Sequence, residues 1–147
     1  YRTYIYFDAE GLASTVVVHI FSGTESSATA SPTDESWAVR LRDSGGTLYV
    51  QCGYGASSGN YSAGVAISLD AWYRIEVKWT FNGGATGVEC KVFNSAGSQV
   101  GTTQTGTAQP NWGVRYVHAG LHTYDAANSG TIYIDAIGLN AAGYLGQ

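Results

Sequence analysis

The sequence predicts an all-β fold, a two-sheet antiparallel β-sandwich formed by a single domain that spans residues 1–147. Three observations predict it. Apolar and polar residues alternate along most of the chain, which is the pattern of strands with one buried face and one wet face. Gly-rich turn sequences separate the alternating runs, and no long window shows uninterrupted helical spacing. Several one-sided strands bury their apolar faces when two sheets pack together.

Candidate strands, rich in Val, Ile, Tyr, Trp and Phe, follow one another along the chain. They are residues 3–7, 15–21, 37–42, 47–53, 65–69, 72–81, 87–93, 114–121 and 131–139. The strand-like pattern is already present at Tyr1, and the chain has no Met. We therefore expect further residues to precede Tyr1 in the protein.

Turn chemistry assigns the connections between these strands. The sequences DSGG at residues 43–46 and NGG at residues 82–84 predict two hairpins, because Gly, Asn and Asp tolerate the positive φ of tight turns. The stretches 22–36 and 100–112 are rich in Ser, Thr and Gly and contain both prolines. They are predicted to be long surface loops.

The period of two assigns each side chain to a face. In the run 72–79, Tyr73, Ile75, Val77 and Trp79 share the predicted core face, and the charged residues between them face solvent. The same rule places Trp37, Val39, Leu41, Leu48, Val50, Cys52, Val88, Cys90 and Val92 inward, and Arg40, Arg42, Tyr49, Gln51, Glu89 and Lys91 outward.

Charge and composition exclude several functions. Seven Lys and Arg against 11 Asp and Glu give a net charge of −4, so a basic surface for nucleic acid is not expected. No apolar run approaches the roughly 20 residues that a membrane-spanning helix needs. The two cysteines, Cys52 and Cys90, share the inward parity. They form either one disulfide or two small buried apolar residues, and the sequence leaves both alternatives open.

The order of motifs resembles the concanavalin A-like, laminin G-like jelly-roll superfamily. The resemblance is carried by SWAVRLRDSGGTLYV, by ISLDAWYRIEVKW with its hairpin to VECKVF, and by VHAGLHTYDAANSGTIYIDAIGL. It implies a jelly roll in which Trp72 plugs a strand entrance as a marker of the fold. Similar jelly rolls occur in tailed-phage structural proteins and in bacterial surface or secreted proteins. Relatives often carry an opening strand before the point where this chain begins, so a bare sheet edge is expected here.

Carboxylate pairs are the first candidates for catalysis, because glycosidases use two acids about 5 to 9.5 Å apart. The superfamily's glycosidase motif, Glu-x-Asp-x-x-Glu, is absent from the sequence. Asp8 and Glu10 border a predicted turn, and Glu76 and Glu89 alternate with basic residues. We expect cross-strand ion pairs on a solvated face and predict no catalytic residue.

Histidines and tyrosines provide the candidate ligand-binding residues. Alternation places Tyr116, His118, His122 and Tyr124 on one face of their run and turns His19 outward in its own strand. Such a set forms a shallow groove in which rings stack on sugars and polar atoms donate hydrogen bonds. The alternative is that tyrosines simply suit half-exposed sheets.

Metal and cofactor sites are not predicted. On a strand, His118 and His122 lie about 13 Å apart, too far to share a zinc ion. Asp34, Asp70 and Asp125 are scattered and form no calcium motif.

The run YVHAGLH also partly resembles the Tyr-x-Lys-Ala-Gly-x-Tyr motif of jelly-roll alginate lyases, with His118 in place of the Lys and His122 in place of the second Tyr. The other lyase motifs are absent, so a polysaccharide lyase is only the third expectation.

The first functional expectation is a non-catalytic structural or adhesive module on a virion surface, of the capsid decoration or coat type, or in a secreted assembly. Its expected partners are other protein subunits, in a homo-oligomer or a larger assembly, and its location is extracellular or on the virion. The alternative is a lectin-like domain whose partners are glycans.

Overall fold

The computed structural model describes residues 1–8, 17–25, 33–55, 58–82, 85–109, 113–121 and 131–140. Within these ranges the chain forms strands and one short 3-10 helix. They are β1 (Arg2–Asp8), β2 (Val17–Thr24), β3 (Glu35–Ser44), β4 (Thr47–Gly53), η1 (Ser58–Asn60), β5 (Val65–Ile67), β6 (Ala71–Asn82), β7 (Ala85–Phe93), β8 (Gln99–Thr107), β9 (Tyr116–Ala119) and β10 (Thr131–Gly138). None of the helical residues in these ranges belongs to a helix long and apolar enough to cross a membrane.

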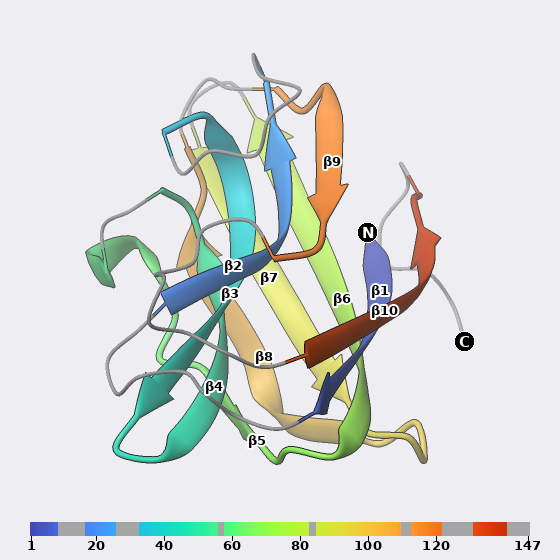
Figure 1. Cartoon of the computed structure of the whole chain (residues 1–147). Helices are drawn as coiled ribbons and strands as arrows, with labels where there is room; N and C mark the ends of the chain where they lie inside the picture. Colours follow the sequence, from blue (N-terminus) through green and yellow to red (C-terminus); the bar gives the residue numbers. More distant parts are fainter. Residues whose placement is uncertain are drawn as a thin grey trace.

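The strands form two five-stranded sheets that pack face to face (Figure 1). Sheet A has the order β10-β1-β6-β7-β8, and sheet B has the order β5-β4-β3-β2-β9. All the strand pairs are antiparallel. The fold is therefore the predicted all-β two-sheet antiparallel sandwich, and its arrangement is consistent with a jelly roll.

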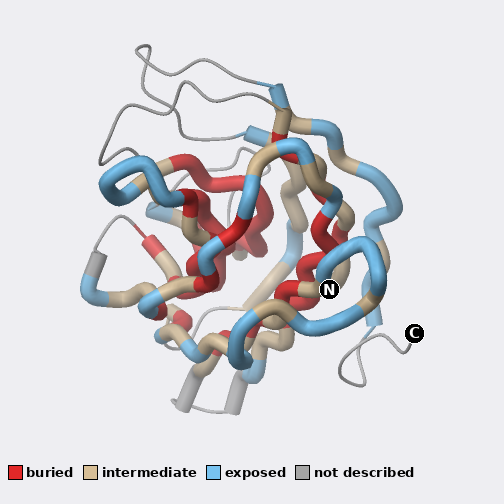
Figure 2. The backbone as a smooth tube through the Cα atoms, turned by 90° about the horizontal axis from the view of Figure 1, so that it is seen from below, coloured by how far each residue is buried: buried red, intermediate tan, exposed pale blue. Residues whose placement is uncertain are grey.

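The core lies between the sheets and is formed by the residues that the alternation placed inward. In β6, Tyr73, Ile75 and Val77 are buried. The buried stretches of the backbone gather in the middle of the molecule, and the exposed ones lie around them (Figure 2). The largest fully buried side chain, Trp37, packs edge-on against Phe21 with ring centroids 5.2 Å apart. Two-residue periodicity thus predicts the inner faces correctly, except in β2, where a register shift brings Phe21 into the core next to Ile20.

The two sides of the sandwich differ. On one side β8 packs against β4 and β5, so the sheets converge there. Gly106 makes the approach possible, because a Cβ at this position would lie 2.1 Å from the carbonyl oxygen of Cys52. On the opposite side the edge strands are β9 and β10 (Figure 1).

Both predicted hairpins are present. Ser44 pairs with Thr47, and Gly45 and Gly46 between them have φ of 65° and 81°. Asn82 pairs with Ala85 in the second hairpin, whose two glycines lie outside the described residues.

Both predicted surface loops need correction. Residues 100–112 are not one loop, because β8 occupies Gln99–Thr107 and pairs with β7. Its Thr-rich sequence favours a strand, but as an edge strand it buries few side chains and shows no apolar alternation. The loop expected at 22–36 is shorter, since β2 extends to Thr24 and β3 begins at Glu35.

Candidate functional site

Three of the five predicted ligand-binding residues lie on sheet B in the part of the chain that the structure describes. His19 lies on β2, and Tyr116 and His118 lie on β9, which is the neighbouring strand. Ser22 pairs with His118, and the Nε2 atom of His118 is hydrogen-bonded to the Thr24 hydroxyl at 3.1 Å. Alternation therefore placed these residues on the correct face, the one directed away from the core. Their predicted companions His122 and Tyr124 lie outside the described residues.

His19 nevertheless does not face solvent, which corrects the prediction. It is 2 % exposed, as is Arg40, which pairs with it in the adjacent strand. The next residue of this cross-strand row, Gln51, was also expected in solvent and is buried. The reason is that the chain after β4 folds back over this face. We call residues 54–55 and 58–63 the covering segment, and we call His19, Glu35, Arg40, Gln51 and His118 the polar face of sheet B.

Tyr61 is the central contact of the covering segment. The guanidinium carbon of Arg40 lies 3.5 Å from the centroid of its ring. The His19 ring meets it edge-on with a centroid separation of 5.9 Å. The Tyr61 hydroxyl donates a hydrogen bond to the carbonyl oxygen of Gly55 at 3.0 Å. Burial raises the pKa of this hydroxyl, so it stays protonated.

Hydrogen bonds join the polar face to the covering segment. Arg40 donates from Nε to Gln51 Oε1 at 2.9 Å. Gln51 in turn donates from Nε2 to the carbonyl oxygens of Ser62, at 2.8 Å, and Ala63, at 3.2 Å. Buried polar groups are stable only when they are paired in this way.

Glu35 is the residue that the sequence analysis missed. Its Oε1 lies 2.7 Å from His19 Nδ1, and its side chain is fully buried. Burial raises the pKa of Glu35, while its hydrogen bond with His19 acts in the opposite direction. The sequence carries one usable signal, an acidic residue directly before the SWAV strand.

A carboxylate that holds an imidazole is the orienting pair of many general acid–base sites. Here that pair lies beneath the covering segment, where neither side chain reaches the surface. The arrangement as it stands can order the outer face of sheet B, but it does not present the imidazole to a substrate.

The outer face of sheet A presents a second candidate site. Tyr6 pairs with Tyr133 of β10 on one side and with Trp72 of β6 on the other. The ring centroids are 5.9 Å and 5.4 Å apart, respectively. We call these three residues the aromatic row. Trp72 is 39 % exposed, so it is not the buried plug that the resemblance implied; it shares the outward parity of Arg74 and Glu76.

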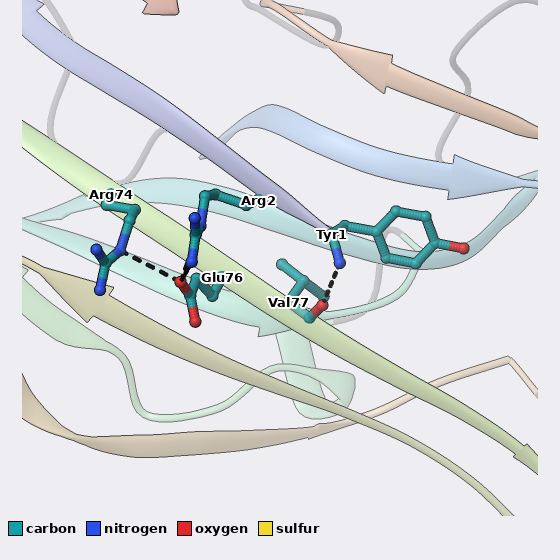
Figure 3. Close-up of polar contacts among 5 residues, drawn as sticks. All are labelled: Tyr1, Arg2, Arg74, Glu76 and Val77. Atoms are coloured by element: carbon teal, nitrogen blue, oxygen red, sulfur yellow. Dashed lines mark hydrogen bonds and ion pairs between the residues drawn. The ribbon is translucent and has the colours of Figure 1, made fainter. Parts of the chain in front are cut away.

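Ion pairs lie on the same face of sheet A. Glu76 binds Arg2 across the strands, and the Nε atom of Arg74 lies 3.2 Å from the same carboxylate (Figure 3). Lys78 and Glu89 form a longer pair at 3.9 Å. The predicted cross-strand ion pairing is confirmed. The solvated environment is confirmed only for Lys78 and Glu89, because the Glu76 side chain is 5 % exposed.

The described residues contain no group of three or more His, Cys, Asp or Glu side chains placed to hold a metal ion. Cys52 and Cys90 are both buried and free. No family model matches the chain, and no match is found among curated proteins or solved structures.

Proposed function

We propose that this chain is a non-catalytic structural or adhesive module of the concanavalin A-like, laminin G-like type, which acts by surface contact on a virion or in a secreted assembly. One observation carries the proposal. Across the described part of the chain, five of the six exposed large apolar side chains lie in or directly after β9 and β10. They are Tyr116, Leu121, Tyr133, Ile137 and Leu139, which we call the apolar edge.

Exposed apolar side chains gathered on one side of a small domain mark contact surfaces. The apolar edge lies on the side of the sandwich opposite to the contact of β8 with β4 and β5. The register of β10 against β1 shifts between Asp135 and Gly138, and Ala136 has a φ of 48°. Such a bulge hinders the addition of another strand. Side-chain packing therefore supports a contact here better than β-augmentation does.

The occupant that best fits this edge is a second copy of the chain, since a homo-oligomer buries the same apolar residues from both partners. The test is the mass of the chain in solution, measured by light scattering over a range of concentrations. We expect a mass above that of the monomer for the wild type and a monomer for Ile137→Glu. Thr105→Glu, on the exposed part of β8, is the matched control and should leave the mass of the wild type unchanged. A wild type that stays monomeric at every concentration would overturn the proposal.

Glycan binding is the second candidate function, and the aromatic row favours it. Tyr133 is 51 % exposed beside Trp72, and exposed rings on a sheet face stack on the apolar faces of sugars. Retention on immobilised polysaccharides tests this. We expect Trp72→Ala to lose about tenfold in affinity, equivalent to about 1.4 kcal/mol, whereas Tyr116→Ala, on sheet B, should bind like the wild type. Loss with Tyr116→Ala alone would move the site to sheet B.

A further inference from the structure

Cys52 and Cys90 belong to different sheets and are directed at each other through the core. Cys52 lies on β4 of sheet B and Cys90 on β7 of sheet A, and neither is exposed to solvent. The Sγ atom of Cys52 lies 3.6 Å from the carbonyl oxygen of Gln104 and 3.9 Å from that of Val88. Gln104 is the cross-strand partner of Cys90, and Val88 precedes Cys90 by two residues on the same face. The sulfur of Cys52 therefore reaches the part of sheet A that carries Cys90.

The two sheets approach each other unusually closely at this point. Packed sheets are normally about 10 Å apart, whereas a disulfide needs Cα atoms about 4.4 to 6.8 Å apart. Gly106 brings the backbone of β8 against that of Cys52, because there is no side chain between them. β4 also packs directly on β7 along this side. The convergence therefore favours an intersheet bond on this side of the sandwich.

The two thiols also differ in acidity. Their mutual hydrogen bond lowers the pKa of Cys52 and raises that of Cys90. A thiol that donates to its neighbour stabilises the neighbouring thiolate. Within the folded pair, the hydrogen bond therefore favours the negative charge on the Cys52 sulfur.

We propose that Cys52 and Cys90 are an oxidation site, at which a small disulfide such as oxidised glutathione converts the two thiols into an intersheet disulfide. The thiolate of one cysteine attacks the oxidant, forms a mixed disulfide and releases one glutathione thiolate. The other cysteine then loses its proton, attacks the protein sulfur of the mixed disulfide and releases the second glutathione. Two protein thiols are oxidised, one glutathione disulfide is reduced to two thiols, and the proton of each cysteine passes to a glutathione or to solvent.

Burial determines when this bond forms. Because both sulfurs are closed to solvent in the folded chain, the oxidant reaches them during folding or in transient openings. The bond joins the two sheets and closes the chain between residues 52 and 90, which restricts the unfolded state. Proteins outside the reducing cytosol retain such bonds. The inference does not depend on the apolar edge or on the aromatic row.

The experiment is to refold the whole chain from denaturant in a mixture of reduced and oxidised glutathione, and in parallel with excess reductant. Free thiols are then alkylated under denaturing conditions, and the protein is digested and analysed by mass spectrometry. We expect a peptide pair linked through Cys52 and Cys90, no alkylation of either residue, and a thermal midpoint about 10 °C above that of the reduced chain.

The doubly substituted Cys52→Ala, Cys90→Ala chain is the control, and its midpoint should be the same in both buffers. Native chain exposed to the same mixture without unfolding should form the bond much more slowly than refolding chain. Full alkylation of both cysteines in a chain that has refolded in oxidised glutathione would overturn the proposal. Bonds that link two chains instead would overturn it as well.

Discussion

The outer faces of the two sheets are built from the same alternation but differ in what covers them. On sheet A, the face directed away from the core carries the aromatic row, in which Tyr133 is half exposed, and the Lys78–Glu89 ion pair in contact with solvent. On sheet B, the equivalent face carries His19, Arg40 and Gln51, all of which are buried. On sheet B the polar residues are thus covered by a segment from elsewhere in the chain. On sheet A the aromatic row is exposed, and the buried Arg74 and Glu76 are paired within the sheet.

This comparison separates two properties that are easily confused. The period of a strand determines which face a side chain belongs to. It does so correctly on both sheets except at the register shift in β2, where Ile20 and Phe21 both enter the core. Whether that face meets water depends on a segment elsewhere in the chain. On sheet B the covering segment supplies Tyr61 and two carbonyl oxygens, so residues of the polar face contact protein groups in place of water. The aromatic row is packed together within sheet A itself.

The covering segment provides the largest expected effect. A Cβ at Gly53 would lie 2.3 Å from the carbonyl oxygen of Asn60 and 2.8 Å from the Cα of Tyr61. Gly53→Ala must therefore displace the segment and weaken its bonds to the polar face. We expect the free energy of unfolding, measured in urea, to fall by about 3–4 kcal/mol.

Gly87→Ala on sheet A is the matched control, because nothing lies within 4 Å of a Cβ at that position. It should change the free energy of unfolding by less than about 0.5 kcal/mol. Equal losses for the two variants would mean that the covering segment contributes nothing particular to the fold of sheet B.

Sequence patterns predicted the frame of the sandwich well. The strand at residues 47–53 coincides with β4, and the inward set of β6 is correct. β8 was missed because its Gln and Thr side chains bury little surface at the sheet margin. The turn directly before β8 is the sequence signal that could have revealed this strand. In that turn the Asn94 side chain accepts hydrogen bonds from the backbone of Ala96 and Ser98, and Gly97 has a φ of 79°.

The candidate site was predictable only in part, for two physical reasons. The register between β2 and β3 shifts between His19 and Phe21 and again at Thr24, so no regular count of residues leads from His19 to Glu35. The covering segment is composed of Gly, Ser, Ala, Asn and Tyr, a composition that is typical of exposed loops. Nothing in the local sequence of the covering segment predicts that it folds onto sheet B, because its contacts there are with residues distant along the chain.

Removing a ring from each face sharpens the comparison further. Tyr61→Ala uncovers the Arg40 guanidinium and the His19 ring, so we expect the free energy of unfolding to fall by about 2–3 kcal/mol. Tyr133→Ala removes a ring that is half in water, and its cost should stay below about 1 kcal/mol. Both values come from the same urea titrations. A larger loss for Tyr133→Ala would mean that the aromatic row of sheet A, and not the polar face of sheet B, is the better covered of the two.

The smallest expected effect is a pH dependence of the free energy of unfolding that comes from Glu35 on the polar face of sheet B. Burial raises the pKa of Glu35 in the folded chain above its ordinary value of 4.5, so the folded state holds this proton over a range in which the unfolded state has lost it. The stability that this group contributes is therefore fully present below pH 4.5 and is lost as the pH rises through the raised pKa. Glu35→Gln keeps an acceptor for His19 but cannot ionise, so it should not show this loss.

We expect the free energy of unfolding of the wild type, relative to Glu35→Gln, to decrease by about 1 kcal/mol between acidic and neutral pH. Urea titrations at several pH values measure the difference. Glu89→Gln on sheet A is the matched control, because it leaves Glu35 in place and should therefore keep the decrease that the wild type shows. Parallel profiles for the wild type and Glu35→Gln would contradict the prediction. They would mean that water reaches Glu35 beneath the covering segment. The outer faces of the two sheets would then differ less in their exposure to water than the buried polar face indicates.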